Sequence, residues 1–195
     1  VKTNYLVKSL AYVPLKVGAK VIGVLLVDNK VSNTPFTDND IYLLSMLADK
    51  YEVTSDNQLA DVALDTFKGL KLCATVHGKH GFVARGVCLE DGRSVCLTSS
   101  RDQYTHFVHG LWRYYHSPLC DDTTRTEICT LIRAVADRMI KNVTPENDYD
   151  FLRADDSRDP RGICRMWNVY PHEAARLPMI YAAAWDMCGD EEYFK

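Results

Sequence analysis

The 195-residue sequence lacks several features that would narrow its class. No apolar run approaches the roughly 20 residues that a membrane-spanning helix needs, and no secretory signal peptide is visible. The formal net charge of −3 gives no reason to expect a nucleic-acid partner. We therefore expect a cytoplasmic protein with no membrane partner and no nucleic-acid partner.

The seven cysteines are irregularly spaced, and no two of them form a Cys-x-x-Cys pair. Because their number is odd, they cannot all pair within one chain, and we expect mostly reduced, buried side chains. Closely spaced ligand pairs typical of zinc sites are absent. His77-x-x-His80 and His106-x-x-His109 each offer two nitrogens but no obvious third ligand. The sequence therefore predicts no metal site, and nothing in it indicates a cofactor.

The first fifty residues contain two apolar runs followed by one helical segment. The runs SLAYVPL (9–15) and KVIGVLLV (20–27) are rich in branched and apolar residues, and Gly18 lies in the turn between them. This pattern predicts a β-hairpin. An amphipathic helix is predicted to begin at Thr37, where the hydroxyl caps it and two aspartates suit its N-terminus.

Three motifs of this part are the VPL strand, the VIGVLLVDN strand and the PFTDNDIYLLSMLA helix. Together they make residues 1–51 resemble the C-terminal part of a GAF domain. The resemblance implies a small-molecule-binding or signalling module of the kind found in bacterial regulators. A whole GAF domain is about three times longer, so most of its ligand pocket would be missing here. The alternative interpretation is that these residues serve only as scaffold.

After Tyr51 the character of the chain changes to aromatic-rich helical segments. Apolar periodicity and capping residues predict helices over 56–76, from the hydroxyls at 98–100 to about 116, over 123–141 and over 171–187. Asp121 or Asp122 is the expected cap of the third helix, and Gly189 ends the last. Pro178 predicts a kink or a tighter first turn in that helix.

Two polar-aromatic clusters in this part have a composition suited to carbohydrate, because aromatic faces and planar polar groups bind sugars. The first holds a candidate catalytic carboxylate, Asp102, which could act as acid, base or nucleophile. Its candidate substrate-binding residues are Arg101, Gln103, Tyr104, His106 and Trp112. The alternative is that Asp102 only caps a helix and pairs with Arg101 at the surface.

The second cluster holds Trp167, His172 and Glu173. His172 and Glu173 are candidate acid and base groups, and Trp167 is a candidate platform for a sugar ring. The alternative is that Glu173 favours the helix dipole and His172 caps the helix. Glycoside hydrolysis usually needs two carboxyl groups about 5–10 Å apart, and Asp102 with Glu173 is the candidate pair.

Three further stretches carry a second resemblance: GFVARGVCLEDGRSVCLTSSRDQYTHFVHGLWRYYHSPL, NVTPENDYDFLRADD and MWNVYPHEAARLPMIYAAAWDMCGD. Residues 56–195 resemble an internal stretch of a six-hairpin glycosidase-like protein, a toroid of paired helices around a cleft. The resemblance implies polysaccharide or glycoside processing. By motif, it places Arg101, Asp102, Gln103, His106, His172 and Glu173 along the cleft. A toroid needs twelve helices and this segment supplies about four, so we expect an open cleft and exposed apolar faces that favour self-association.

The sequence thus predicts an α+β chain with a short β-hairpin plus helix at 1–51 and a mainly α-helical, partial α/α-toroid segment at 56–195. The predicted function is that of a carbohydrate-processing, glycoside hydrolase-like fragment joined to a partial GAF module. The alternatives are a non-enzymatic small-molecule-binding or signalling module of GAF type, and a chimera without joint function.

Overall fold

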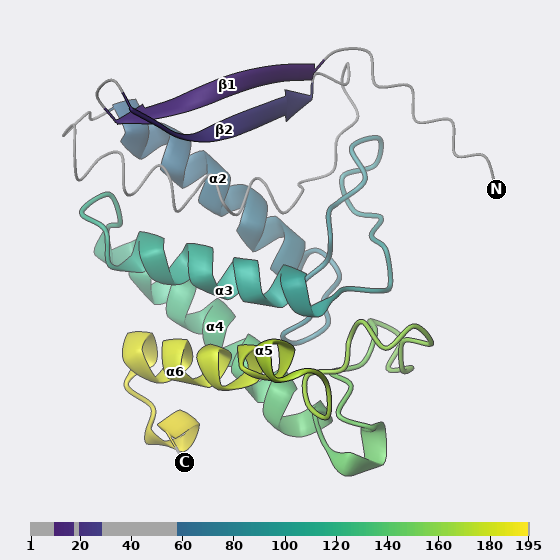
Figure 1. The fold of residues 1–195 in the computed structure, drawn as a ribbon. Coiled ribbons are helices and arrows are strands. Elements are labelled where there is room, and N and C mark those ends of the chain that lie inside the picture. The colour runs from purple at the N-terminus through teal and green to yellow at the C-terminus, as the bar shows by residue number, and fades with distance from the viewer. Residues whose placement is uncertain (1–9, 18–19, 29–57, 195) are drawn as a thin grey trace. The chain divides into compact units, whose positions relative to one another are not determined.

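The computed structural model describes residues 10–17, 20–28 and 58–194 of the chain (Figure 1). The chain divides into two compact units, Val1–Thr34 and Pro35–Lys195. The turn expected at Gly18, the helix expected from Thr37 and the boundary between 51 and 56 lie outside the described residues.

The first unit contains two strands, β1 (Leu10–Val17) and β2 (Lys20–Asp28). They pair antiparallel, with Leu10 opposite Asp28 and Val17 opposite Lys20, and the register shifts between Leu15 and Lys16. Branched and apolar side chains in both strands suit an extended backbone. These two strands pair with each other in a two-stranded ladder.

The second unit is built from helices of very different length. They are α2 (Gln58–Thr75), α3 (Arg101–Tyr115), α4 (Asp122–Asn142), α5 (Pro171–Ala174) and α6 (Arg176–Cys188), with 3₁₀ turns η1 (Pro145–Asn147) and η2 (Glu191–Phe194). Ser100 caps α3 by accepting the Gln103 amide, and Asp121 caps α4 by accepting the Thr124 amide at 2.7 Å. Gly189, with φ 70°, ends α6 in the left-handed conformation. The predicted caps and stop are therefore confirmed.

The single helix predicted over 171–187 is two helices in the structure, separated at Ala175. Pro178 explains the break. A proline has no amide to donate to the carbonyl four residues earlier, and its ring clashes with that carbonyl, which here belongs to Ala174. The helix is therefore interrupted one turn before the proline, and α6 begins at Arg176.

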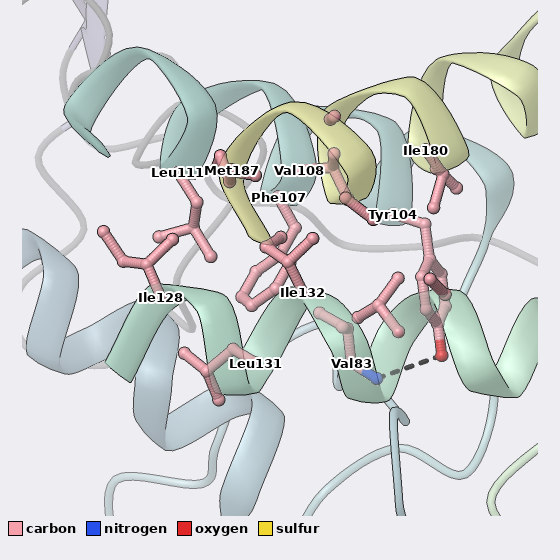
Figure 2. Close-up of a cluster of buried hydrophobic side chains, with 14 of the residues drawn as sticks. Val83, Tyr104, Phe107, Val108, Leu111, Ile128, Leu131, Ile132, Ile180 and Met187 are labelled. Carbon is pink, nitrogen blue, oxygen red and sulfur yellow. Dashed lines mark hydrogen bonds between the residues drawn. The ribbon is translucent and has the colours of Figure 1, made fainter. Parts of the chain in front are cut away.

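One hydrophobic core holds α3, α4 and α6 together (Figure 2). α6 contacts both α3 and α4, which also contact each other. Phe107 and Leu111 of α3 meet Ile132 of α4 in this core, and each is fully buried. Tyr104 places its hydroxyl at the edge of the core, where it accepts the Val83 amide at 3.1 Å and donates to a backbone carbonyl at 2.9 Å.

The predicted fold class is wrong, because the described chain is mainly helical. Residues 58–194 contain no strand, and their backbone pairing outside helices includes two isolated bridges, Val87 with Val95 and Asp150 with Arg165. Four helices, α2, α3, α4 and α6, contribute buried side chains to one core. Local apolar patterns predict which face of a helix is buried but not which helix it packs against.

No disulfide joins the seven cysteines, all of which lie in the described helical unit; Cys73, Cys120 and Cys164 are buried. Among the described residues, no helix is both long and apolar enough to cross a bilayer.

Candidate functional site

Arg101, in the first turn of α3, connects three parts of the helical unit. Its guanidinium donates to Glu173 Oε1 of α5 at 2.6 Å and to the backbone carbonyls of Gly162 and Arg165 at 2.7 and 2.9 Å. The Arg101 and Glu173 side chains are only 15% and 20% exposed. A charge-assisted bond at this depth is stronger than one in open water. Arg101 therefore ties α3 to α5 and to the loop before it.

A second ion pair lies beside the first. Arg176, the first residue of α6, donates to Asp102 of α3. The Asp102 side chain is 56% exposed, so solvent reaches this pair more freely. The hydrogen bond and the charge of Arg176 hold the pKa of Asp102 below its ordinary value, with His106 and Arg101 acting in the same direction. Asp102 is therefore an ionised acceptor at neutral pH.

The two ion pairs unite clusters that lie more than 70 residues apart in the sequence. Arg101 and Asp102 are consecutive, while Glu173 and Arg176 lie on consecutive helices. Cations and anions therefore alternate across the joint between α3 and α5–α6. Arg101, Asp102, Glu173 and Arg176 thus form a crossed ion-pair site.

The other predicted residues of the first cluster lie along α3. Gln103 and Tyr104 are buried, and His106 is half-buried. Trp112, near the other end of α3, donates its indole N–H to Asp186 of α6 at 2.7 Å. These side chains differ in burial and in partners because residues at successive positions of a helix face different directions.

The aromatic residues of the second cluster lie in the segment that enters α5. Trp167 is 47% exposed, and Tyr170 is 73% exposed. His172 is exposed and stacks on Tyr170, with ring centroids 6.0 Å apart and planes at 11°. Trp167 and Tyr170 thus present exposed aromatic rings in the segment that leads into α5.

The loop before α5 forms a partly open cavity of about 440 Å³. Most of its lining residues carry charged side chains: Asp148, Asp150, Arg158, Asp159, Pro160, Gly162 and Arg165. Gly162 and Arg165 are the residues whose carbonyls Arg101 holds. The cavity and the crossed ion-pair site therefore share one wall.

Two carboxyl groups of the cavity have pKa values displaced in opposite directions. Burial raises the pKa of Asp150, although the amides of Leu152 and Asp159 bond its oxygens at 2.6 and 3.2 Å. Burial also acts on Asp159, but the Arg161 guanidinium and amide outweigh it, so the pKa of Asp159 is lowered. Opposed shifts of neighbouring carboxyl groups distinguish an acid from a base in many sites.

The cavity loop is held in shape by two buried side chains of α4. Arg138 donates to the carbonyls of Leu152 and Arg153, both at 3.0 Å, and Asn142 donates to the carbonyl of Phe151 at 3.1 Å. Within the described part of the chain, the left-handed backbone also occurs at five residues other than glycine: Asp148, Tyr149, Leu152, Asp156 and Asn168. Such conformations cost free energy and persist only where surrounding contacts fix them.

Sequence reasoning missed the cavity residues. The region from 145 to 161 reads as a charged, polar loop, which is also what a solvated connection looks like. The many Asp and Arg residues between the two predicted helices were the only indication of a site. The sequence could not show that this loop is partly buried, because the side chains that cover it come from α4 and α3.

The histidine pairs have other contacts in the structure. His80 bonds Asp137 at 3.2 Å, and His77 packs against the Phe82 ring. In the part of the chain that the structure describes, no group of three His, Cys, Asp or Glu side chains could hold a metal ion.

Comparison with known proteins identifies one region. Residues 1–54 match the model of the GAF domain. No curated protein and no solved structure matches the chain. The predicted GAF resemblance is therefore confirmed, whereas nothing in the comparisons concerns six-hairpin glycosidases. The first 54 residues are thus similar to the GAF domain, a signalling and ligand-binding module.

Proposed function

We propose that the helical unit binds a saccharide at the crossed ion-pair site. The observation that carries the proposal is the pair of contacts from α3 to α5 and α6, Arg101 with Glu173 and Asp102 with Arg176. They bring together two clusters whose composition suits sugar recognition.

The chemistry of these groups supports a polyhydroxylated ligand. Carboxylates accept and guanidiniums donate hydrogen bonds in fixed planar geometry, and each carboxylate has more acceptor sites than its ion pair occupies. Sugar hydroxyls act as both donors and acceptors, so they can bond both kinds of group. The exposed rings of Trp167 and Tyr170 offer apolar faces for the C–H side of a pyranose.

Binding is better supported than hydrolysis. Glycoside cleavage needs a carboxylic acid that donates a proton to the leaving oxygen. Asp102 has a lowered pKa and is ionised at neutral pH, so it is suited to accept hydrogen bonds and not to donate a proton. Hydrolysis, with Asp102, Glu173 or His172 as catalytic groups, is a finer proposal that the same experiment tests.

The test uses the full chain and a panel of methyl glycosides of glucose, galactose, mannose and xylose. Amide chemical shifts report binding, and release of reducing sugar from oligosaccharides reports hydrolysis. Asp102→Asn and Glu173→Gln should each weaken binding several-fold. Glu127→Gln is the matched control, because Glu127 of α4 also forms an ion pair, with Lys71 of α2 at 2.8 Å, and belongs to neither cluster. Absence of any binding by the wild-type chain would refute the proposal.

The match of residues 1–54 supports a second candidate function, small-molecule binding by the GAF-like segment. Equilibrium dialysis of the full chain against nucleotides tests it. Saturable binding that Asp102→Asn and Glu173→Gln leave unchanged would support it. Failure to retain any nucleotide of the set would count against nucleotides as its ligands.

A further inference from the structure

The cavity in the loop before α5 is a site that the two sequence clusters do not include. We propose that this cavity binds one neutral, polyhydroxylated ring, as a subsite continuous with the crossed ion-pair site. This inference rests on the proposed function, because it assigns a second subsite to the same saccharide.

The size of the cavity suits a small ligand. About 440 Å³ lies within the range of ~300–1,000 Å³ typical of small-molecule pockets. Pro160 and Gly162 are its only uncharged lining residues, so the walls offer carboxyl oxygens, guanidinium N–H groups and backbone groups. A ligand that enters must replace the hydrogen bonds of water to many polar groups. A ring bearing several hydroxyls can do so, whereas an apolar ligand cannot.

The charges of the cavity favour a neutral ligand. Asp148 pairs with Arg165, and its Oδ2 atom lies 3.9 Å from Arg158. Asp159 pairs with Arg161 at 3.2 Å. These pairs compensate most of the charge, so neither a cation nor an anion gains a large unpaired partner. The balance points to hydroxyl groups as the recognised chemistry.

Asp150, which also lines the cavity, is buried, with 3% of its surface exposed. In the described chain its carboxyl group is held by two backbone amides, those of Leu152 and Asp159. A carboxylate has about four acceptor sites, so two remain after these bonds. Asp150 can therefore bond a ligand hydroxyl without losing its structural contacts.

The cavity is formed in advance of any ligand. Arg138 and Asn142 fix the carbonyls of the loop from inside the helical unit, and these contacts hold its left-handed residues in place. A preorganised site loses little conformational entropy on binding. Because Arg101 holds Gly162 and Arg165, the cavity also keeps a fixed distance from Glu173.

Substitution of a glycine that lines the cavity tests whether the cavity takes part in binding. Gly162 lines the cavity with φ 69°, and a Cβ placed there meets no atom within 4 Å. Gly92 has φ 65° and the same open surroundings but lies in a separate turn. Asparagine tolerates the left-handed backbone better than most residues. Gly162→Asn therefore adds a side chain at the cavity, and Gly92→Asn is its matched control.

The experiment measures binding of the methyl glycoside panel to the full chain by amide chemical shifts. Gly162→Asn should weaken binding by about tenfold, the equivalent of one or two lost hydrogen bonds. Gly92→Asn should bind as the wild type does. Arg158→Gln, on a side chain that is 60% exposed, should also weaken binding without endangering the fold, with Arg93→Gln as its control.

The outcomes separate this inference from the proposed function. If glycosides bind and only Asp102→Asn and Glu173→Gln weaken that binding, the cavity is not a subsite and the proposed function stands. If the cavity variants weaken binding and their controls do not, the subsite is supported. If no glycoside binds the wild-type chain, both proposals are overturned.

Discussion

The two ion pairs of the crossed ion-pair site should differ in strength by a measurable amount. The Arg101–Glu173 pair joins atoms 2.6 Å apart, with side chains 15% and 20% exposed. In the Asp102–Arg176 pair the side chains are 56% and 24% exposed. Solvent screening weakens an exposed pair, because water competes for both partners. We therefore expect the first pair to contribute more to stability than the second.

Double-mutant cycles give the magnitude. Arg101→Met and Glu173→Gln, singly and together, should yield a coupling energy of about 1.5–3 kcal/mol, as for hydrogen bonds to charged groups. Arg176→Met with Asp102→Asn should yield about 0.2–1 kcal/mol, as for exposed pairs. The single change Arg101→Met should cost more than Glu173→Gln, because it also removes the bonds to two carbonyls.

The assay is urea unfolding of the full chain at pH 7, followed by circular dichroism, with the midpoint converted to a free energy. Repetition in about 0.5 M salt should reduce the coupling of the exposed pair by the larger fraction. Equal couplings for the two pairs, or a coupling below about 0.5 kcal/mol for Arg101 with Glu173, would refute the assignment of Arg101 as the link between α3 and α5.

Three further predictions concern single residues. Tyr104→Phe should cost about 1–3 kcal/mol for each of the two backbone groups that its hydroxyl bonds. Tyr170→Phe should be nearly neutral, since the Tyr170 ring is 73% exposed, and the urea midpoints of the two variants decide this. Gly81→Ala should lower the thermal midpoint far more than Gly92→Ala. Both glycines have positive φ, which costs about 1–2 kcal/mol for alanine. Of the two, Gly81 is the position at which the new Cβ would overlap a backbone carbonyl of α4. Because the pKa of Asp102 is lowered from 3.8, the contribution of its ionised carboxylate to folding stability is complete above that pH and is lost as the pH falls through the folded-state pKa. The difference in unfolding free energy between wild type and Asp102→Asn should therefore close in acid. A difference that widens below pH 3.8 would contradict the ion pair with Arg176.

Local features of the helical unit were readable from the sequence. Ser100 and Asp121 cap their helices, and Gly189 ends α6, because a cap depends on a side chain and amides within the next few residues. Pro178 also predicts a disturbance of the last helix, and the structure has a break at Ala175, because the missing amide and the proline ring interrupt the helix one turn earlier. The fold class was predicted wrongly, because helical periodicity gives the buried face of a helix and not its partner.

By itself the sequence determined where helices form and which segments carry sugar-compatible side chains, since both follow from neighbours within a few positions. It also determined the GAF-like character of residues 1–54, through the residue types of that segment. Only the tertiary structure decided that Arg101 meets Glu173 and that Asp150 lies buried in a cavity. Those contacts join residues far apart in the chain. Their energy depends on burial, and burial is a property of the packed helices and not of any one segment.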